Sequence, residues 1–276
     1  MKFKIVSDSS ADVLSLSSVD FESVPLTIRA GDTEYVDDAS LDTSEMLAYL
    51  KKYKGRSGSA CPSPNAYLEA FGDADAVFCI TITSNLSGSY NSAMNAARMY
   101  TEKYPERRVR VIDSLSTGPE NSLIIDRIAA LIGEGLDFDE ICERVTEYQK
   151  STHLIFSLES LHNLASNGRV NPLVAKIAGV LGIRVVGCAS AVGTLEITNK
   201  SRGAQGALRD ILKNMKANGY SGGRVRIHHA SNPAAAEAVQ RGILSEFPSA
   251  SVTVGTTRGL CSFYAEEGGI LVGYEA

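Results

Sequence analysis

The sequence predicts an α/β protein of two domains: a mostly parallel sheet flanked by helices, then a second α/β domain with a mixed sheet. Apolar, β-rich runs alternate with segments of helical periodicity over the first 150 residues, a pattern typical of parallel strands joined by helices. After about residue 150 the alternation restarts and includes two strands joined by a tight turn. We therefore expect domains at 1–150 and 151–276, with no obvious linker between them.

Strands are expected where β-branched and other apolar residues are concentrated, and helices where apolar residues recur three or four positions apart. In the first domain these criteria predict strands at 4–7, 24–28, 76–83 and 108–112, and helices at 46–53, 67–71, from 90 onwards, around 124–131 and at 138–148. In the second domain they predict strands at 153–158, 183–190, 194–198, 224–229, 251–255 and 270–274, and helices around 161 and at 174–181, 203–217 and 236–247. Val192-Gly193 joins two of these strands and indicates a hairpin.

Composition and charge exclude several classes of protein. The chain is 44% hydrophobic and 21% charged, as ordinary globular proteins are, and its net charge of −5 argues against a nucleic-acid surface. We expect no signal peptide, because Ser7-Asp8 interrupts the first apolar run, and no membrane span, because Lys176 and Arg184 interrupt the most apolar window. The five cysteines are odd in number and form no CxxC pair. They favour reduced thiols in the cytoplasm and no metal site.

Three expected strands end in turns rich in hydroxyl groups, at 7–10, 83–88 and 113–118. Because the carboxyl ends of parallel strands meet at one edge of a sheet, these turns could form a shared polar crevice. Helix N-termini and hydroxyl groups bind anions. Neither GxxxxGK[ST] nor GxGxxG is present, so a carboxylate or a lone phosphate suits this crevice better than a nucleotide. Each turn by itself is more typical of helix capping, and it is the three together that favour a crevice.

Candidate catalytic residues are few. No G-x-S-x-G elbow occurs, and His228-His229 stands at the end of an expected strand. Asp8 and Asp113 follow strands and could share a metal, as in phosphotransfer enzymes, but an aspartate after a strand also commonly caps the next turn. The residues thus indicate binding more clearly than catalysis.

The chain resembles the DegV fatty-acid-binding proteins over nearly its whole length. Eight blocks match that family in order: KIVSDSSADV (4–13), VPLTI with GDTEYVDD (24–38), SACPSP (59–64), SNLSGSYNSA (84–93), VIDSLS (111–116), LHNLASNGRVN (161–171), LGIRVVG (181–187) and IHHASNPAAAEAV (227–239). The resemblance implies a two-domain α/β carrier without catalytic activity or cofactor. It would hold one long-chain fatty acid in an apolar tunnel and present it to a fatty acid kinase, which makes acyl-phosphate for phospholipid synthesis.

The resemblance also assigns residues to the carboxylate, between the domains. The Ser87 hydroxyl and the Gly88 N–H would donate to it, Ser59 stands where the family has a threonine that does the same, and Arg169 matches an arginine near the head group. Three further residues are expected beside the head group: Ser84, Cys61 and Tyr264. Helices rich in small residues, with Ala93, Ala96, Ala97 and 234–236, would leave room for the acyl chain or would simply favour helix formation.

The sequence departs from the family pattern near its C-terminus. Where the family reads H-x-G-P-G, this chain has Tyr264 in place of the histidine, followed by Glu266 and Glu267. Two acids beside the head group would repel a carboxylate unless they point away from it. Two other hypotheses therefore stay open. One is an enzyme acting on a small phosphate or acyl ester through Asp8, Asp113 and Ser87; the other is a sensor or interaction protein whose lipid is structural.

Overall fold

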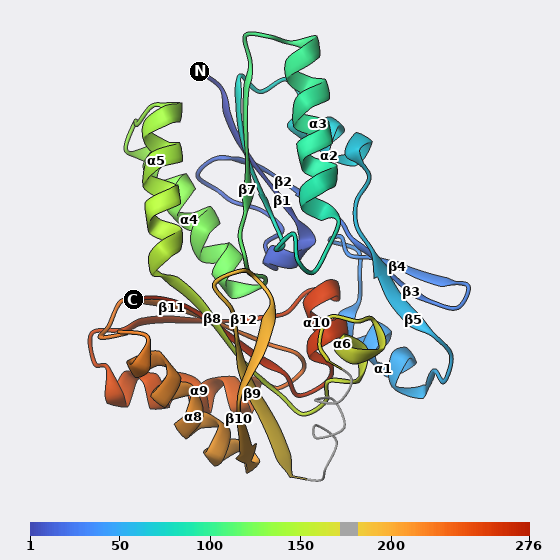
Figure 1. Cartoon of the computed structure of the whole chain (residues 1–276), viewed down its shortest axis with the longest axis vertical. Coiled ribbons are helices and arrows are strands. Elements are labelled where there is room, and N and C mark those ends of the chain that lie inside the picture. The colour runs from blue at the N-terminus through green and yellow to red at the C-terminus, as the bar shows by residue number, and fades with distance from the viewer. Residues whose placement is uncertain (172–181) are drawn as a thin grey trace.

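The computed structural model describes residues 1–171 and 182–276. Two large sheets with their covering helices lie one above the other in Figure 1, and β8 is the first strand of the lower sheet along the chain. The helix expected at 174–181 lies outside the described residues. None of the helices in the described ranges is both long and apolar enough to cross a bilayer.

The first sheet is parallel throughout and has the strand order β2-β1-β6-β7. These strands are β1 (Phe3–Asp8), β2 (Asp20–Val24), β6 (Ala76–Thr81) and β7 (Arg108–Asp113). All six residues of β6 are buried, because helices cover both faces, as parallel sheets require. One face carries α2 (Pro64–Phe71) and α3 (Ser89–Lys103), and the other carries α4 (Pro119–Gly133) and α5 (Phe138–Tyr148). The expected parallel sheet is confirmed.

The second sheet is mixed, as expected, with the order β10-β9-β8-β13-β11-β12. Its strands are β8 (Thr152–Leu158), β9 (Ile183–Ala189), β10 (Leu195–Arg202), β11 (Arg224–His229), β12 (Ser251–Thr256) and β13 (Ile270–Glu275). Only β11 and β12 pair in parallel among its described neighbours. One face packs on α8 (Gly203–Ala217) and α9 (Pro233–Glu246), and the other on α6 (His162–Ser166) and α10 (Gly259–Ala265). The boundary near residue 150 stays a prediction.

The prediction of one strand at 24–28 was wrong. The chain there forms two strands in different sheets: β2 ends at Val24, and β3 (Thr27–Ala30) pairs with β4 (Thr33–Val36) and β5 (Ser57–Ala60) in a third, antiparallel sheet. Pro25 has no N–H to donate to a strand, and the N–H of Leu26 donates to Ser9 Oγ at 3.1 Å. The ladder is therefore interrupted between the two strands.

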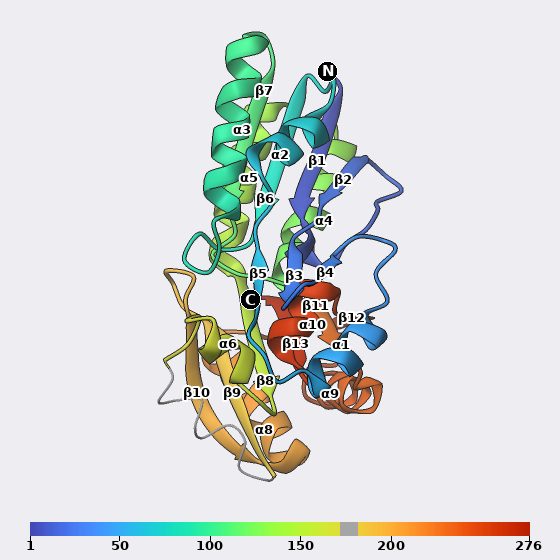
Figure 2. The ribbon, with the colours of Figure 1, turned by 90° about the vertical axis from the view of Figure 1, so that its right-hand side faces the viewer.

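This third sheet belongs to the first domain and contacts α10 (Gly259–Ala265) of the second domain. Figure 2 shows β3 and β4 directly above α10, at the level where the two large sheets meet. Ile28 of β3 and Met46 of α1 (Thr43–Lys52) pack on Phe263 of α10. The sequence did not predict β4, β5 or α10, because these elements are short and lack an apolar repeat.

Candidate functional site

A cavity with about 630 Å³ of empty space, including its mouth, lies between the two domains. Its wall is mostly aliphatic and comes from both domains and from α10. The apolar lining residues are Leu26, Ile82, Leu86, Leu154, Phe156, Leu158, Leu164, Leu195, Leu260, Ala265 and Leu271. A concave wall that is mostly apolar, with a few polar groups, is typical of small-molecule sites.

Four polar residues expected from the sequence line this cavity. Ser59, on β5, and Tyr264, on α10, have their hydroxyl oxygens 2.9 Å apart. Ser87 lies in the turn between β6 and α3, and its hydroxyl is 3.0 Å from that of Ser89. Arg169 follows α6 and donates from Nε to the carbonyl oxygen of Leu86 at 3.1 Å. The fold thus brings residues from four separate segments to one cavity.

The other three expected residues, Gly88, Cys61 and Ser84, do not line the cavity. Gly88 is the N-cap residue of α3, and a Cβ atom at this position would lie 3.1 Å from the Cys61 sulfur. Ser84 stands at the far end of the turn, where its N–H donates to Asp113 Oδ1 at 3.1 Å. Gly88 directly follows the lining residue Ser87. Ser84 instead joins the turn after β6 to the end of β7.

The two acids near the C-terminus point away from the cavity. Glu266 accepts hydrogen bonds from Ser160 Oγ at 2.9 Å and from the N–H of Asn163 at 3.0 Å. Glu267 is exposed and pairs with Lys51 Nζ at 2.6 Å. Neither is among the lining residues, so both carboxylates have their partners outside the cavity.

The three hydroxyl-rich turns do meet at one edge of the parallel sheet, and they bind mainly to one another. The Thr83 N–H donates to the Ser116 carbonyl at 2.9 Å, and the Gly118 N–H to that of Ser10 at 2.7 Å. Asp8 is buried and accepts from Ser10 Oγ at 2.5 Å and from the N–H of Ile82 at 3.0 Å. Its burial raises the pKa of the carboxyl to about 6.

The proposed catalytic residues are used in structural contacts. Asp113 accepts from the N–H groups of Ser84 and Leu115. His228 Nδ1 lies 2.8 Å from Asp12 Oδ2, and His229 Nδ1 accepts from the N–H of Asn232. Within residues 1–171 and 182–276, no three His, Cys, Asp or Glu side chains are grouped so as to hold a metal ion. All five cysteines are free thiols.

Sequence reasoning missed most of the apolar wall. Leu154, Phe156 and Leu158 alternate along β8 and line the cavity; this period-two pattern is readable, but it does not say what covers the face. The expectation that Ala93, Ala96 and Ala97 leave room for a chain was wrong, because these side chains are packed in the core between α3 and the parallel sheet. Cys261 also lines the cavity and was not expected, and so does Thr117, from the hydroxyl-rich turn at 113–118.

Fold and cavity together define a class: two-domain α/β proteins with an apolar cavity between the domains and a polar cluster at its wall. The family model described as uncharacterised proteins of the DegV family matches residues 2–276. The chain belongs to the DegV family. A DegV domain-containing protein of Streptococcus pneumoniae is 43% identical over 100% of this chain and 99% of its own length.

Two solved structures of high similarity contain fatty acids. A DegV family protein from Eubacterium eligens, loaded with heptadecanoic acid, is 46% identical with a TM-score of 0.98, over 99% of both chains. The Streptococcus pneumoniae fatty acid kinase (Fak) B3 protein, loaded with linoleic acid, is 43% identical with a TM-score of 0.98, over 100% of this chain and 99% of that one.

Proposed function

We propose that this protein binds one long-chain fatty acid in the cavity between its domains and carries it, without catalysis or cofactor, to a cytoplasmic fatty acid kinase. The observation that carries the proposal is the cavity itself: its wall is mostly aliphatic and also includes Ser59, Ser87, Arg169 and Tyr264. A molecule that matches this surface is long, apolar and anionic at one end.

The apolar wall accounts for most of the expected affinity. Burying a chain of roughly fifteen methylenes contributes on the order of 12 kcal/mol, at ~0.8 kcal/mol for each methylene. A hydrogen bond to a charged group adds roughly 1.5–3 kcal/mol. The hydrocarbon tail therefore supplies the binding energy, and the polar residues decide which end of the ligand lies where.

The polar cluster suits a carboxylate. Ser87 and the Gly88 backbone lie at the start of α3, where the helix dipole favours negative charge. Arg169 supplies a cation at the cavity wall, and Ser59 and Tyr264 supply hydroxyl donors. Tyr264 donates a hydrogen bond but carries no positive charge near neutral pH, so Arg169 is the cationic partner of the ligand.

The structural relatives support this proposal. The Eubacterium eligens protein holds a saturated fatty acid and the Streptococcus pneumoniae protein an unsaturated one. The latter is a fatty acid kinase B3 protein, which supports a kinase as the partner of this chain. The alternative of an enzyme built on Asp8 and Asp113 is less well supported, because both carboxylates already accept hydrogen bonds from backbone N–H groups at the strand ends.

The first experiment is mass spectrometry of the organic extract from freshly purified protein. A fatty acid present in one equivalent supports the proposal and gives the chain length. An empty extract, together with no uptake of added hexadecanoic acid, contradicts it. The loaded protein is then mixed with ATP and a bacterial fatty acid kinase, and acyl-phosphate formation tests the carrier role.

The second experiment tests the carboxylate site. Ser59→Ala combined with Ser87→Ala should weaken binding of hexadecanoic acid far more than binding of its methyl ester. Ser245→Ala, at an exposed position on α9, is the control. Equal losses for acid and ester would show that these hydroxyls do not hold the carboxylate. Asp8→Asn should leave binding largely intact, whereas it would abolish an Asp8-dependent hydrolysis.

A further inference from the structure

The helix α10 lacks a capping residue of its own. The residue at its N-cap is Arg258, whose side chain makes no capping hydrogen bond. The hydroxyl of Thr257, the residue before it, donates to the carbonyl of His229 and lies 2.7 Å from the Ser262 hydroxyl. The first N–H groups of a helix have no partner within the helix, so those of α10 must find one elsewhere.

Two aspartates of the first domain supply these partners. Asp37, which follows β4, accepts from the N–H of Gly259 with Oδ1 at 2.7 Å and from that of Leu260 with Oδ2 at 2.8 Å. Asp12 accepts from the N–H of Arg258 at 2.6 Å. Both carboxylates are fully buried. They form a cap in which the helix belongs to one domain and the acceptors to the other.

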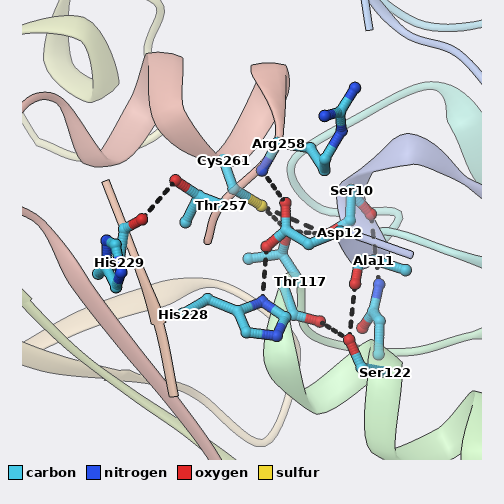
Figure 3. Close-up of polar contacts among 12 residues, drawn as sticks. Ser10, Ala11, Asp12, Thr117, Ser122, His228, His229, Thr257, Arg258 and Cys261 are labelled. Atoms are coloured by element: carbon cyan, nitrogen blue, oxygen red, sulfur yellow. Dashed lines mark hydrogen bonds and ion pairs between the residues drawn. The ribbon is translucent and has the colours of Figure 1, made fainter. Parts of the chain in front are cut away.

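Asp12 is itself fixed from the second domain. Its other oxygen lies 2.8 Å from Nδ1 of His228 on β11, so the carboxylate stands between β11 and the start of α10 (Figure 3). Close by, the Cys261 thiol of α10 donates to the carbonyl of Ser10 at 3.3 Å. The backbone at Asp12 has a φ of +59°, a left-handed conformation that aspartate tolerates better than most residues.

The position of α10 decides the shape of the cavity. Leu260, Cys261, Tyr264 and Ala265 all line it, and Tyr264 carries the hydroxyl that meets Ser59. The contact with Asp37 is also tight: a Cβ atom at position 259 would lie 2.7 Å from Asp37 Oδ1 and 2.5 Å from a methyl group of Leu41. Only glycine allows this approach.

We infer that Asp37 and Asp12 are positioning residues for the ligand. While the two domains are docked, these carboxylates hold α10 in the position where its side chains complete the cavity. The effect on ligand affinity rests on the proposed function, whereas the capping of α10 does not. It makes Asp37, which lines no part of the cavity, a determinant of fatty acid affinity.

The test compares Asp37→Asn with Asp42→Asn. Asp42 also accepts two helix N–H groups, at the start of α1, but it is exposed and α1 does not line the cavity. Three quantities are measured in the full-length protein: affinity for hexadecanoic acid, amide hydrogen exchange of residues 258–265, and the effect of Tyr264→Phe in each background.

We expect Asp37→Asn to weaken binding at least tenfold and to accelerate exchange in α10, with Asp42→Asn changing affinity less than threefold. Tyr264→Phe should cost less affinity in the Asp37→Asn background than in the wild type, since α10 no longer holds the phenol in place. A merely structural role for Asp37 predicts additive effects. Unchanged affinity and unchanged exchange in Asp37→Asn, or additivity, would overturn the inference.

If Asp37→Asn does not fold, Gly259→Ala tests whether the contact with Asp37 positions α10. The added methyl group pushes the start of α10 away from Asp37 without removing a charge, so it should raise exchange of the same amides and lower affinity. Native exchange and affinity in this variant would contradict the inference. If the wild type binds no fatty acid, the proposed function fails, while the exchange measurements on the unliganded protein still decide whether Asp37 holds α10.

Discussion

The hydroxyl oxygens of Ser59 and Tyr264 lie 2.9 Å apart, although 205 positions separate these residues in the chain. Ser59 belongs to the small sheet of the first domain and Tyr264 to α10 of the second. The pair therefore joins the two domains at the wall of the cavity.

Restoring the histidine of the family pattern at this position should make binding depend on pH. A histidine with an ordinary pKa of about 6.5 gains positive charge as the pH falls and then attracts a carboxylate. We expect Tyr264→His to bind hexadecanoic acid more tightly at pH 6 than at pH 8, relative to the wild type at each pH. Hexadecanol, which carries no charge, is the control ligand; an equal pH response with both ligands would refute this prediction.

Arg169→Gln should lower affinity for the acid selectively. The guanidinium lines the cavity and holds the Leu86 carbonyl through Nε. Losing a hydrogen bond to a charged group costs roughly 1.5–3 kcal/mol, about 10- to 100-fold in affinity. Competition against a fluorescent fatty acid measures the loss, and the methyl ester should lose much less. Arg98→Gln, at an exposed position on α3, should have no effect.

Gly193→Ala should destabilise the docking of the β9–β10 hairpin on the first domain. Gly193 has a φ of +78°, and a Cβ atom there would lie 2.2 Å from Thr83 Oγ1. Gly135 has a φ of +80° with no atom within 4 Å of such a Cβ, so Gly135→Ala reports the backbone cost alone, about 1–2 kcal/mol. Denaturant unfolding should show a clearly larger loss for Gly193→Ala. Equal losses would mean that the hairpin tip accommodates the methyl group.

Stability should depend on pH through Glu120, which is buried at the start of α4 and accepts from Thr152 Oγ1 at 2.8 Å. Burial raises its pKa from 4.5 to about 7. The folded state therefore holds this proton more tightly than the unfolded state, so stability falls as the pH rises from about 4.5 through 7. Glu120→Gln should remove this fall.

The measurement is the free energy of unfolding of both proteins between pH 5 and pH 8. The advantage of Glu120→Gln over the wild type should grow with pH and level off above 7. His153 and His229 have lowered pKa values because of burial and act in the opposite direction, but they do so in both proteins and cancel in the difference. A pH-independent difference would show that Glu120 does not titrate in this range.

Regular elements with strong apolar patterns were predicted well. The helices at 203–217 and 138–148 and the strand at 224–229 have the observed bounds, because one face of each packs on a core and leaves a period in the sequence. β4, β5 and α10 were missed. The strands are four residues long and lie outside the two large sheets, and α10 is buried on nearly all sides, so no alternation marks them.

The sequence by itself determined the succession of strands and helices and the polar residues that stand at the ends of strands. Those features depend on local propensity and on neighbours a few positions apart. Only the tertiary structure decided that Ser59, Ser87, Arg169 and Tyr264 line one cavity, that Glu266 and Glu267 face away from it, and that Asp37 caps a helix of the other domain. Each of these relationships joins residues far apart in the chain, so tertiary packing, including the docking of the two domains, sets their distances.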